Sequence, residues 1–331
     1  MSKQSFYILK NGTIKRKDNN VTMISEDGLK KDLKIEVARD IYLFGEVNLN
    51  TKFLNYTSQM KVPIHVFNYY GFYSGTYYPR DSNVSGRLLV KQVEYYQNDK
   101  KRLGIAKEFI DSASHNIYRN LRYYNERDKD LGKQIELIKG LRPKIKKCEA
   151  INELMGIEGN IRKNYYTGWN IIVNQEIDFN KRVKRPPDNM INSLISFINS
   201  LIYTTILSEI YKTQLNPTIS YLHEVGDKRF SLCLDIAEIF KPLIGDRLIF
   251  TLLNKRIITE KSFDEGSNFY YLKDKERLKI LKLYDERLKS TIMHKTLRKQ
   301  VSYRHLMRLE CYKLIKHLQG DKEYEGFKIW W

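Results

Sequence analysis

The chain changes character within the stretch FYSGTYYPRDSNVSGRLLVKQVE, residues 72–94. Before it, short strand-like runs alternate with turn residues, and after it, apolar residues recur at three- and four-residue spacing. Strands followed by helices are typical of an α+β protein or of two separate domains. We therefore predict an α+β fold, with a small β-rich N-terminal domain (residues 1–80) and a larger all-α domain (residues 81–331).

The β-rich part contains enough short apolar runs for six to eight strands. Asn11-Gly12 lies inside the run SFYILKNGTIKRK and predicts a β-hairpin, because a tight type I′ turn needs positive φ at both central positions. Residues 49–60 predict one helix. The other strand-like runs are NVTMIS, DLKIEVA, DIYLFG, VPIHVFN and FYSGTYYP.

The second part predicts helices that are interrupted at prolines. Helical periodicity covers 87–94, 98–111 and 116–124, and we expect breaks at Pro143, Pro186-Pro187, Pro217 and Pro242. The uncharged stretch NMINSLISFINSLIYTTILS, residues 189–208, is long enough to cross a membrane. Its many Asn, Ser and Thr side chains are costly in lipid, so a buried core or dimer-interface helix is the better interpretation.

Composition favours a nucleic-acid partner. The 331 residues include 58 Lys and Arg against 39 Asp and Glu, a formal charge of +19, which favours a polyanion over a neutral partner and leaves an anionic membrane surface as second choice. Three cysteines without a CxxC pair exclude a disulfide scaffold and argue against a cysteine zinc site. The polar start lacks the apolar core of a secretory signal, so we expect a cytoplasmic protein without a membrane partner.

Two segments contain carboxylates in unusual settings. The sequence predicts a helix over 231–240 that carries Asp235 and Glu238 on one face, shortly after His223. Carboxylates on such an apolar helix are costly to bury without positive partners, so either a salt-bridge cluster or a metal ion is expected there. Glu158 lies between Gly156 and Gly159, with Arg162 four residues on as an ordinary intrahelical partner.

The chemistry of these side chains suggests one class of reaction. Two carboxylates and one imidazole suit Mg²⁺ or Mn²⁺ better than Zn²⁺. In a strongly basic chain such a site favours phosphodiester chemistry. The sequence contains no GxxxxGK[ST], GxGxxG or HExxH, so ATP binding, NAD binding and zinc peptidase chemistry are not indicated.

Basic and aromatic residues supply candidate DNA contacts. Tyr165, Tyr166 and Trp169 follow Glu158 and could stack on an unpaired base, although such spacing is more often that of a core. The two basic clusters are either phosphate contacts or solvated faces; they are Arg142, Lys144, Lys146 and Lys147, and Lys181, Arg182, Lys184 and Arg185.

Three segments in order resemble the CRISPR-associated spacer-acquisition integrase family, the first-numbered protein of that system. They are LMGIEGNIRKNYY, PPDNMINSLISFINSLIYTTILSEI and NPTISYLHEVGDKRFSLCLDIAEIFKPLIGDRLI, and the resemblance extends to about residue 300 and favours a type I system. It implies that Glu158, His223 and Glu238 hold Mg²⁺ or Mn²⁺, with Asp235 as an auxiliary catalytic carboxylate. Lys241 stands where Arg is commoner in the family, so its phosphate contact should be less directional.

The resemblance also implies a function. It implies a homodimer joined through the β-rich domain. Two such homodimers would flank a dimer of a small second CRISPR-associated protein in a heterohexamer. The helical domain would join a short DNA fragment to a CRISPR repeat by attack of its 3′-hydroxyl on a phosphodiester. The expected DNA contacts are Lys228, Arg229, Lys241, Arg247, Arg162, Tyr165 and Tyr166.

Two other classes of protein stay open. A stand-alone metal-dependent nuclease acting on branched or double-stranded DNA would use the same residues for hydrolysis. A non-enzymatic nucleic-acid-binding protein would keep the charge without bringing Glu158, His223 and Glu238 together. The C-terminal aromatics, Trp330 and Trp331 included, could dock on the second protein or on another copy, or fold back on the core.

Overall fold

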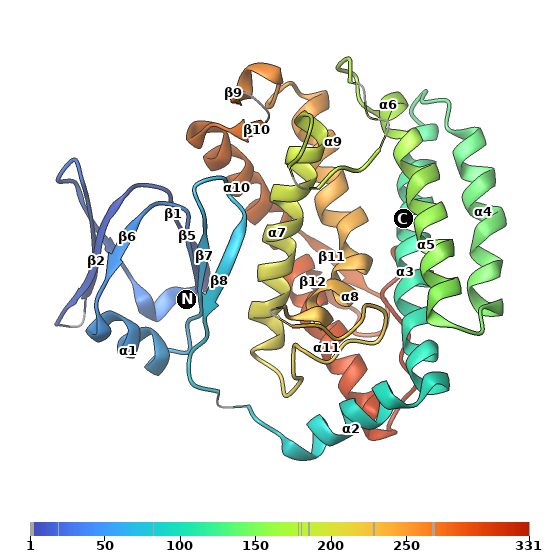
Figure 1. Ribbon diagram of the computed structural model, residues 1–331, viewed down its shortest axis with the longest axis horizontal. Coiled ribbons are helices and arrows are strands. Elements are labelled where there is room, and N and C mark those ends of the chain that lie inside the picture. Colours follow the sequence, from blue (N-terminus) through green and yellow to red (C-terminus); the bar gives the residue numbers. More distant parts are fainter. Residues whose placement is uncertain are drawn as a thin grey trace. The chain divides into compact units, whose positions relative to one another are not determined.

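The computed structural model describes residues 3–18, 20–81, 83–177, 179, 181–184, 186–227, 229–266 and 269–330. The chain divides into two compact units, and each is described by itself. One unit comprises Met1–Ser82 with Tyr271–Asp285, and the other comprises Asn83–Tyr270 with Glu286–Trp331. Figure 1 shows strands concentrated in the N-terminal part of the chain and helices in most of the remainder. The predicted α+β fold class is confirmed.

Two four-stranded sheets form the N-terminal unit. Their strand orders are β1-β5-β7-β8 and β4-β3-β2-β6, and helix α1 (Thr51–Gln59) occupies the predicted helical segment. The inner faces bury an apolar core that includes Ile14, Ile41 and Phe53, none of which has exposed surface. The strands are β1 (Gln4–Ile8), β2 (Gly12–Lys17), β3 (Asn20–Ser25), β4 (Lys30–Leu33), β5 (Ala38–Leu43), β6 (Val47–Leu49), β7 (Ile64–Phe67) and β8 (Tyr73–Tyr77), with a short helical turn η1 (Ile35–Val37).

The hairpin predicted at Asn11-Gly12 is wrong. Strands β1 and β2 on either side of it belong to different sheets, β1 pairing with β5 and β2 with β3 and β6. The Asn11 side chain accepts the backbone N–H of Glu46, and a Cβ on Gly12 would lie 2.1 Å from the carbonyl oxygen of Ile24. This glycine is therefore required by a close backbone approach where the chain crosses between sheets.

Helices build most of the second unit, as predicted, but the all-α expectation missed two short hairpins, β9–β10 and β11–β12. These strands are β9 (Phe263–Gly266), β10 (Phe269–Leu272), β11 (Thr291–His294) and β12 (Lys299–Ser302); β10 and the long helix α10 each run from one unit into the other. The helices are α2 (Gly86–Gln97), α3 (Asp99–Asn125), α4 (Gly132–Lys147), α5 (Ile151–Thr167), α6 (Trp169–Ile172), α7 (Met190–Ile210), α8 (Ser231–Phe240), α9 (Arg247–Asn254), α10 (Asp274–Lys289) and α11 (Tyr303–Gln319), with turns η2 (Lys241–Asp246) and η3 (Glu260–Ser262).

Helix α8 is central to this unit. It contacts α3, α7 and α11. Helix α3 in turn packs on both α4 and α5, which also contact each other (Figure 1). Helix α7, the uncharged segment, is long and apolar enough to cross a membrane, but 83% of its most apolar window is buried inside the structure. Burial among other helices is what the core interpretation of this segment predicts.

Two prolines behave differently from one another. Pro143 lies inside α4, so the predicted break there is wrong. Proline has no N–H, so the carbonyl of Lys139, four residues earlier, has no helical hydrogen bond. Pro143 and Lys139 both face solvent, where water can bond to that carbonyl. Pro242 does end α8 as predicted, and the chain continues as the π-helical turn η2, a geometry that is frequent at functional sites.

Candidate active site

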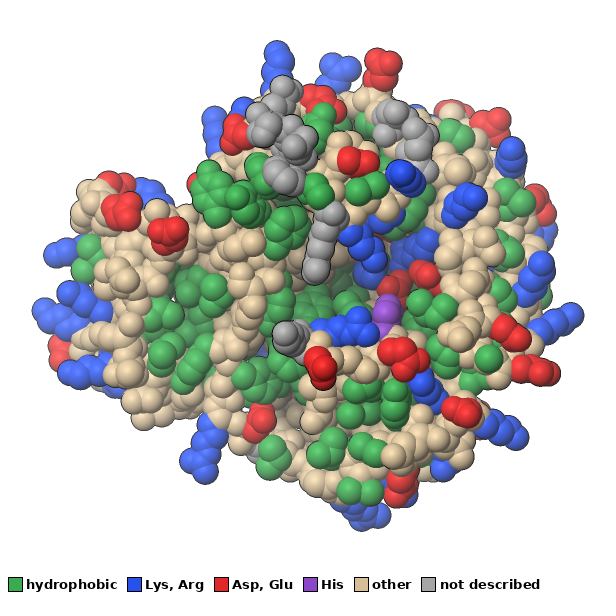
Figure 2. Space-filling model, viewed as in Figure 1, with side chains coloured by type: hydrophobic (Ala, Val, Ile, Leu, Met, Phe, Trp, Pro, Cys, Tyr) green, Lys and Arg blue, Asp and Glu red, His purple; other side chains and the backbone are tan. Residues whose placement is uncertain are grey.

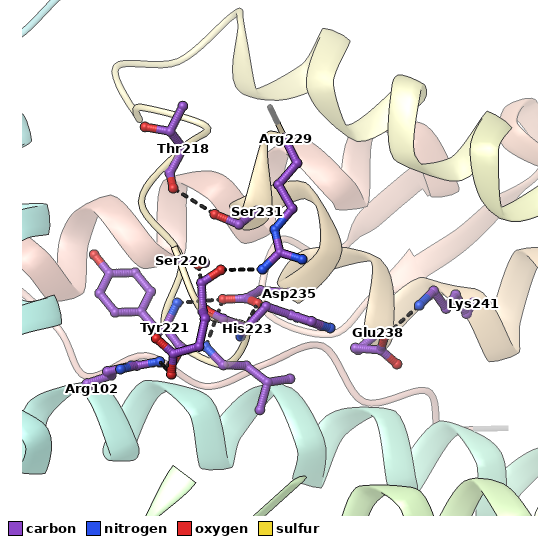
Figure 3. A network of polar contacts seen from close by, with 12 residues as sticks. Arg102, Thr218, Ser220, Tyr221, His223, Arg229, Ser231, Asp235, Glu238 and Lys241 are labelled. Atoms are coloured by element: carbon purple, nitrogen blue, oxygen red, sulfur yellow. Dashed lines mark hydrogen bonds and ion pairs between the residues drawn. The ribbon is translucent and has the colours of Figure 1, made fainter. Parts of the chain in front are cut away.

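Asp235 fixes the position of His223. The carboxylate of Asp235, fully buried on α8, accepts the backbone N–H groups of Tyr221 and Leu222 at 2.6 and 3.0 Å and that of His223 at 3.0 Å. It also accepts Nδ1–H of His223 at 2.8 Å (Figure 3). These four hydrogen bonds satisfy both oxygens of Asp235. They select the tautomer in which Nε2 of His223 keeps its lone pair.

The loop that carries His223 is tied down from both ends. Ser231 at the start of α8 donates to the carbonyl of Thr218 at 2.7 Å, and Ser220 donates to that of His223 at 2.7 Å (Figure 3). Arg102 on α3 donates to the carbonyl of Tyr221 at 2.9 Å. Side chains from α3 and α8 therefore hold this irregular segment in place.

Glu158 and Glu238 meet at one guanidinium. Glu158 lies in the middle of α5 and Glu238 on α8, and Arg162, one turn after Glu158, lies between them. Nε of Arg162 is 3.2 Å from Oε1 of Glu158, while Nη2 donates to Oε2 of Glu238. Arg162 thus makes the expected intrahelical pair with Glu158 and a second contact with Glu238, which lies 76 residues further along the chain.

Glu238 also pairs with a second cation. Nζ of Lys241 lies 2.5 Å from its Oε1 (Figure 3). Burial by itself would raise the pKa of Glu238, but Lys241, Arg162 and His223 outweigh it and hold that pKa well below its usual range. Glu238 is therefore ionised at any physiological pH, as a metal ligand must be.

A further carboxylate near this cluster was not among the predicted site residues. Asp246, at the end of η2, is 4% exposed, and its Oδ2 has no hydrogen-bond partner in the described part of the chain. Burial raises the pKa of Asp246 to about 7, although attraction to Arg162 and a hydrogen bond from Tyr165 oppose the shift. The only sequence signal was one acidic residue in the apolar run KPLIGDRLIF.

The donor set fits a hard divalent cation in chemistry. Glu158 and Glu238 already share one positive group, and Nε2 of His223 is left for a ligand because Asp235 holds Nδ1. Over the residues described here, no three His, Cys, Asp or Glu side chains lie together as a preformed metal cage. The place between the two glutamates is held by Arg162.

The predicted DNA contacts differ in where they lie. Arg229 is exposed and donates to the carbonyl of Glu224 at 2.6 Å, whereas Arg247 stacks on the Tyr123 ring at 4.3 Å. Lys228 lies outside the described residues. Tyr165 is fully buried beside Trp169, so neither face of its ring is accessible to a base. For Tyr165 and Trp169 the alternative of core residues is the right one.

Tyr166 is only partly buried, against Trp169 and Phe179, so a stacking role for it stays a prediction.

Basic side chains surround the carboxylates. Partial desolvation and the nearby cations Lys241 and Arg182 lower the pKa of Lys184, while Glu238 and Glu158 oppose that shift. Lys184 therefore lies within electrostatic reach of the site; Arg185, next to it, lies outside the described residues. Figure 2 shows Lys and Arg side chains gathered beside acidic side chains and a histidine on one face of the helical part. A phosphate close to the carboxylates would meet positive charge.

Comparison with known proteins gives one consistent family. The model of the family "CRISPR associated protein Cas1" matches residues 6–286. A CRISPR-associated endonuclease Cas1 from Fusobacterium nucleatum is 60% identical over 99% of this chain and 97% of its own, and one from Clostridium perfringens is 52% identical over 99% of both.

Solved structures give the same result. A Cas1 protein from Thermotoga maritima matches with a TM-score of 0.86 and 42% identity, covering 98% of this chain and 100% of its own. A casposase bound to an integration product has the same fold, with a TM-score of 0.86 at 20% identity over 97% of this chain and 92% of its own.

Proposed function

Because the chain belongs to the CRISPR-associated Cas1 family, we propose that it is a metal-dependent DNA integrase that adds short DNA fragments to a CRISPR array. One observation carries the proposal. Glu158 and Glu238, from helices distant in sequence, converge on one cation, and the Asp235–His223 pair lies on the same helix–loop unit as Glu238. A protein that only bound nucleic acid would have no need to bury these acids together.

Glu158, Glu238 and Nε2 of His223 would hold Mg²⁺ or Mn²⁺. The ion would supply charge stabilisation to the oxygens of the reacting phosphodiester. Lys241 and Lys184 would hold the flanking phosphates by charge. Among the described residues, no atom outside their own helix turn lies within 4 Å of a Cβ added to Gly156 or Gly159, which leaves room for a DNA backbone to approach.

The reaction needs no energy-rich cofactor. The 3′-oxygen of the fragment bonds to phosphorus, and the bond from phosphorus to the 3′-oxygen of the repeat strand breaks. One phosphodiester thus replaces another: the attacking hydroxyl gives up its proton, and the leaving 3′-oxygen takes one up. His223 is suited to deliver that proton when it is not a ligand, because the hydrogen bond from its Nδ1 to Asp235 fixes the orientation of the ring.

We also propose the assembly that the family resemblance implies. The chain would form homodimers through the β-rich domain, and two of them would flank a dimer of a small second CRISPR-associated protein. In support, two complexes whose names include both Cas1 and Cas2 share the fold of this chain; one has a TM-score of 0.86 at 16% identity. DNA would be bound largely through backbone phosphates, given the charge of +19.

Hydrolysis is the second candidate function, because the curated relatives carry the name endonuclease. The same residues would then activate water in place of a 3′-hydroxyl. Branched or double-stranded DNA would be cut, and no fragment would be joined.

A strand-transfer assay tests these functions. A labelled duplex with free 3′-hydroxyls and a plasmid carrying a repeat array are incubated with the protein, with and without its small partner, in Mn²⁺ or Mg²⁺. We expect label to join the plasmid. Glu158→Gln should abolish joining, with a loss of at least ~10³-fold, and leave DNA binding within about twofold, because it removes a ligand and not a phosphate contact.

Glu153→Gln is the matched control, since it makes the same chemical change at an exposed position of the same helix. It should behave as the unchanged protein. Metal-dependent cutting without joining would identify the nuclease. Equal loss of DNA binding and joining in Glu158→Gln would argue against a catalytic role for this residue.

A further inference from the structure

Arg162 lies between Glu158 and Glu238, where these two proposed metal ligands would bind the divalent cation. Its side chain is 12% exposed and bonds to both Glu158 and Glu238, while Lys241 bonds to the other oxygen of Glu238. Two carboxylates are thus neutralised by two cations. Burial would lower the pKa of Arg162, but Glu238 and then Tyr166 and Glu158 raise it well above its usual value, so the guanidinium keeps its charge.

A divalent cation cannot simply be added to this arrangement. It needs carboxylate oxygens at roughly 2.0–2.2 Å, and Oε2 of Glu238 is already occupied by Nη2 of Arg162. A doubly charged ion beside a fixed guanidinium in a buried site also meets strong repulsion. Arg162 must therefore release Glu238 when the ion enters. A buried guanidinium that loses its partner needs another at once.

Asp246 is placed to receive it. Its Oδ2 is buried and lacks a hydrogen-bond partner among the described residues, and Asp246 interacts electrostatically with Arg162 without a hydrogen bond to it. A buried carboxylate oxygen without a partner is costly and calls for an explanation. Asp246 ends the same turn, η2, that begins with Lys241. The turn η2 therefore carries both Lys241, which pairs with Glu238, and Asp246, which attracts Arg162.

We propose that Arg162 is the counter-ion of the metal-free site and that it passes from Glu238 to Asp246 when a divalent cation binds. This proposal deepens the proposed function and rests on its metal site. Arg162 and Asp246 are then positioning residues for metal loading. Arg162 keeps the empty site neutral and folded, and Asp246 lowers the cost of vacating it.

Mn²⁺ binding measures this exchange without any DNA reaction. The electron paramagnetic resonance signal of free Mn²⁺ gives the dissociation constant for the full-length protein at pH 8, where Asp246 is ionised. We expect Asp246→Asn to weaken Mn²⁺ binding about tenfold or more, the size typical for groups that orient metal ligands. Arg162→Gln should tighten it by a similar factor, because the guanidinium no longer competes with the ion for Glu158 and Glu238.

The double variant separates exchange from plain charge effects. In the Arg162→Gln background, Asp246→Asn should change Mn²⁺ affinity by less than about twofold, since no guanidinium remains for Asp246 to bind. Mn²⁺ should also raise the unfolding temperature of Arg162→Gln more than that of the unchanged protein, because the two glutamates have lost the guanidinium that they share and keep only Lys241 as a counter-ion. Asp227→Asn, at an exposed position in the His223 loop, should change nothing.

Several results would overturn the proposal. One is an Asp246→Asn variant that binds Mn²⁺ as the unchanged protein does. Another is an equal loss from Asp246→Asn in both backgrounds, which would mark a simple charge effect. Either result leaves a metal site intact and with it the proposed function. If the unchanged protein binds no Mn²⁺ at millimolar concentration, the metal-dependent function and the exchange fall together.

Discussion

Asp235 has no free hydrogen-bonding capacity, and this decides its role. Four N–H groups from Tyr221, Leu222 and His223 already use both of its oxygens. It therefore cannot bind a metal ion without giving up the loop. In the proposed reaction its contribution would be to orient His223, which is the kind of auxiliary role that the family resemblance implies.

Replacing Asp235 with Asn should cost both stability and activity. The amide presents an NH₂ group to N–H donors, so at least one buried donor loses its partner at a cost of about 1–3 kcal/mol. That corresponds to a fall in unfolding temperature of roughly 2–12 °C in a unit of this size. We expect strand transfer to fall about 10–100-fold, as is usual when a partner that orients a metal-binding His is lost. Calorimetry and the joining assay measure the two effects.

Asp227→Asn serves again as control, because it makes the same change where the side chain is exposed. An Asp235→Asn variant that joins DNA at the unchanged rate would show that the orientation of His223 does not depend on Asp235.

The sequence allowed Glu158, His223, Asp235 and Glu238 to be named because family motifs carry them. The contact of Arg162 with Glu238 and the burial of Asp246 could not be predicted in the same way. Arg162 has an ordinary partner four residues away, and its second partner lies 76 residues further along the chain. Whether such a side chain faces DNA or a second acid depends on how α5 and α8 pack, and periodicity does not report packing.

Helix α8 depends on the C-terminal segment behind it. The side chain of Asn116 on α3 donates to the carbonyls of Ile239 and Phe327 at 3.0 and 3.1 Å and accepts the N–H of Ile329 at 2.9 Å. The ring of Phe327 stacks on that of Phe240 with 6.3 Å between centroids. The tail thus folds back on the core over its described residues, one of the alternatives predicted; Trp331 lies outside them.

Truncating Phe327 to Ala should destabilise the helical unit markedly. Phe327 is 7% exposed, and emptying such a position typically costs about 3–5 kcal/mol. The unfolding temperature should fall by roughly 6–20 °C. Joining activity should fall as well, because the last turn of α8, next to Glu238, loses its support. Calorimetry of Lys322→Ala, an exposed residue of the same segment, gives the baseline. Equal unfolding temperatures for the two variants would mean that the tail does not support α8.

Local signals predicted elements better than their connections. The helix at 231–240 and the run NVTMIS have the same bounds in the structure as in the sequence reading, because apolar periodicity reflects which face is buried. The hairpin predicted at Asn11-Gly12 was wrong because a strong turn signal does not indicate whether the two flanking strands pair with each other. The helix break predicted at Pro143 was wrong because a helix tolerates the loss of one hydrogen bond on its solvent-exposed face.

The charge of +19 belongs to the whole molecule, and its effect on DNA affinity is testable. If six or more phosphates are contacted, affinity for a short duplex should fall about 10³-fold or more between 50 and 200 mM salt, because bound counterions are released. Fluorescence anisotropy across this range gives the slope of log affinity against log salt. A flat response would argue against phosphate contacts as the main source of affinity.

The position of the charge can be separated from its amount. Lys144, Lys146 and Lys147, exposed near the end of α4, are changed together to Gln; Arg142 is left, since it already pairs with Asp111. The control changes Lys30, Lys31 and Lys34, three exposed lysines of the N-terminal unit, and removes the same charge. If α4 lies along DNA, its variant should lower the magnitude of the salt slope by up to about 2.7, because each phosphate that a lysine no longer neutralises removes roughly 0.9, while the control lowers it by less than about 0.9. Equal slopes for the two variants would mean that net charge alone attracts DNA and that α4 is an ordinary solvated face.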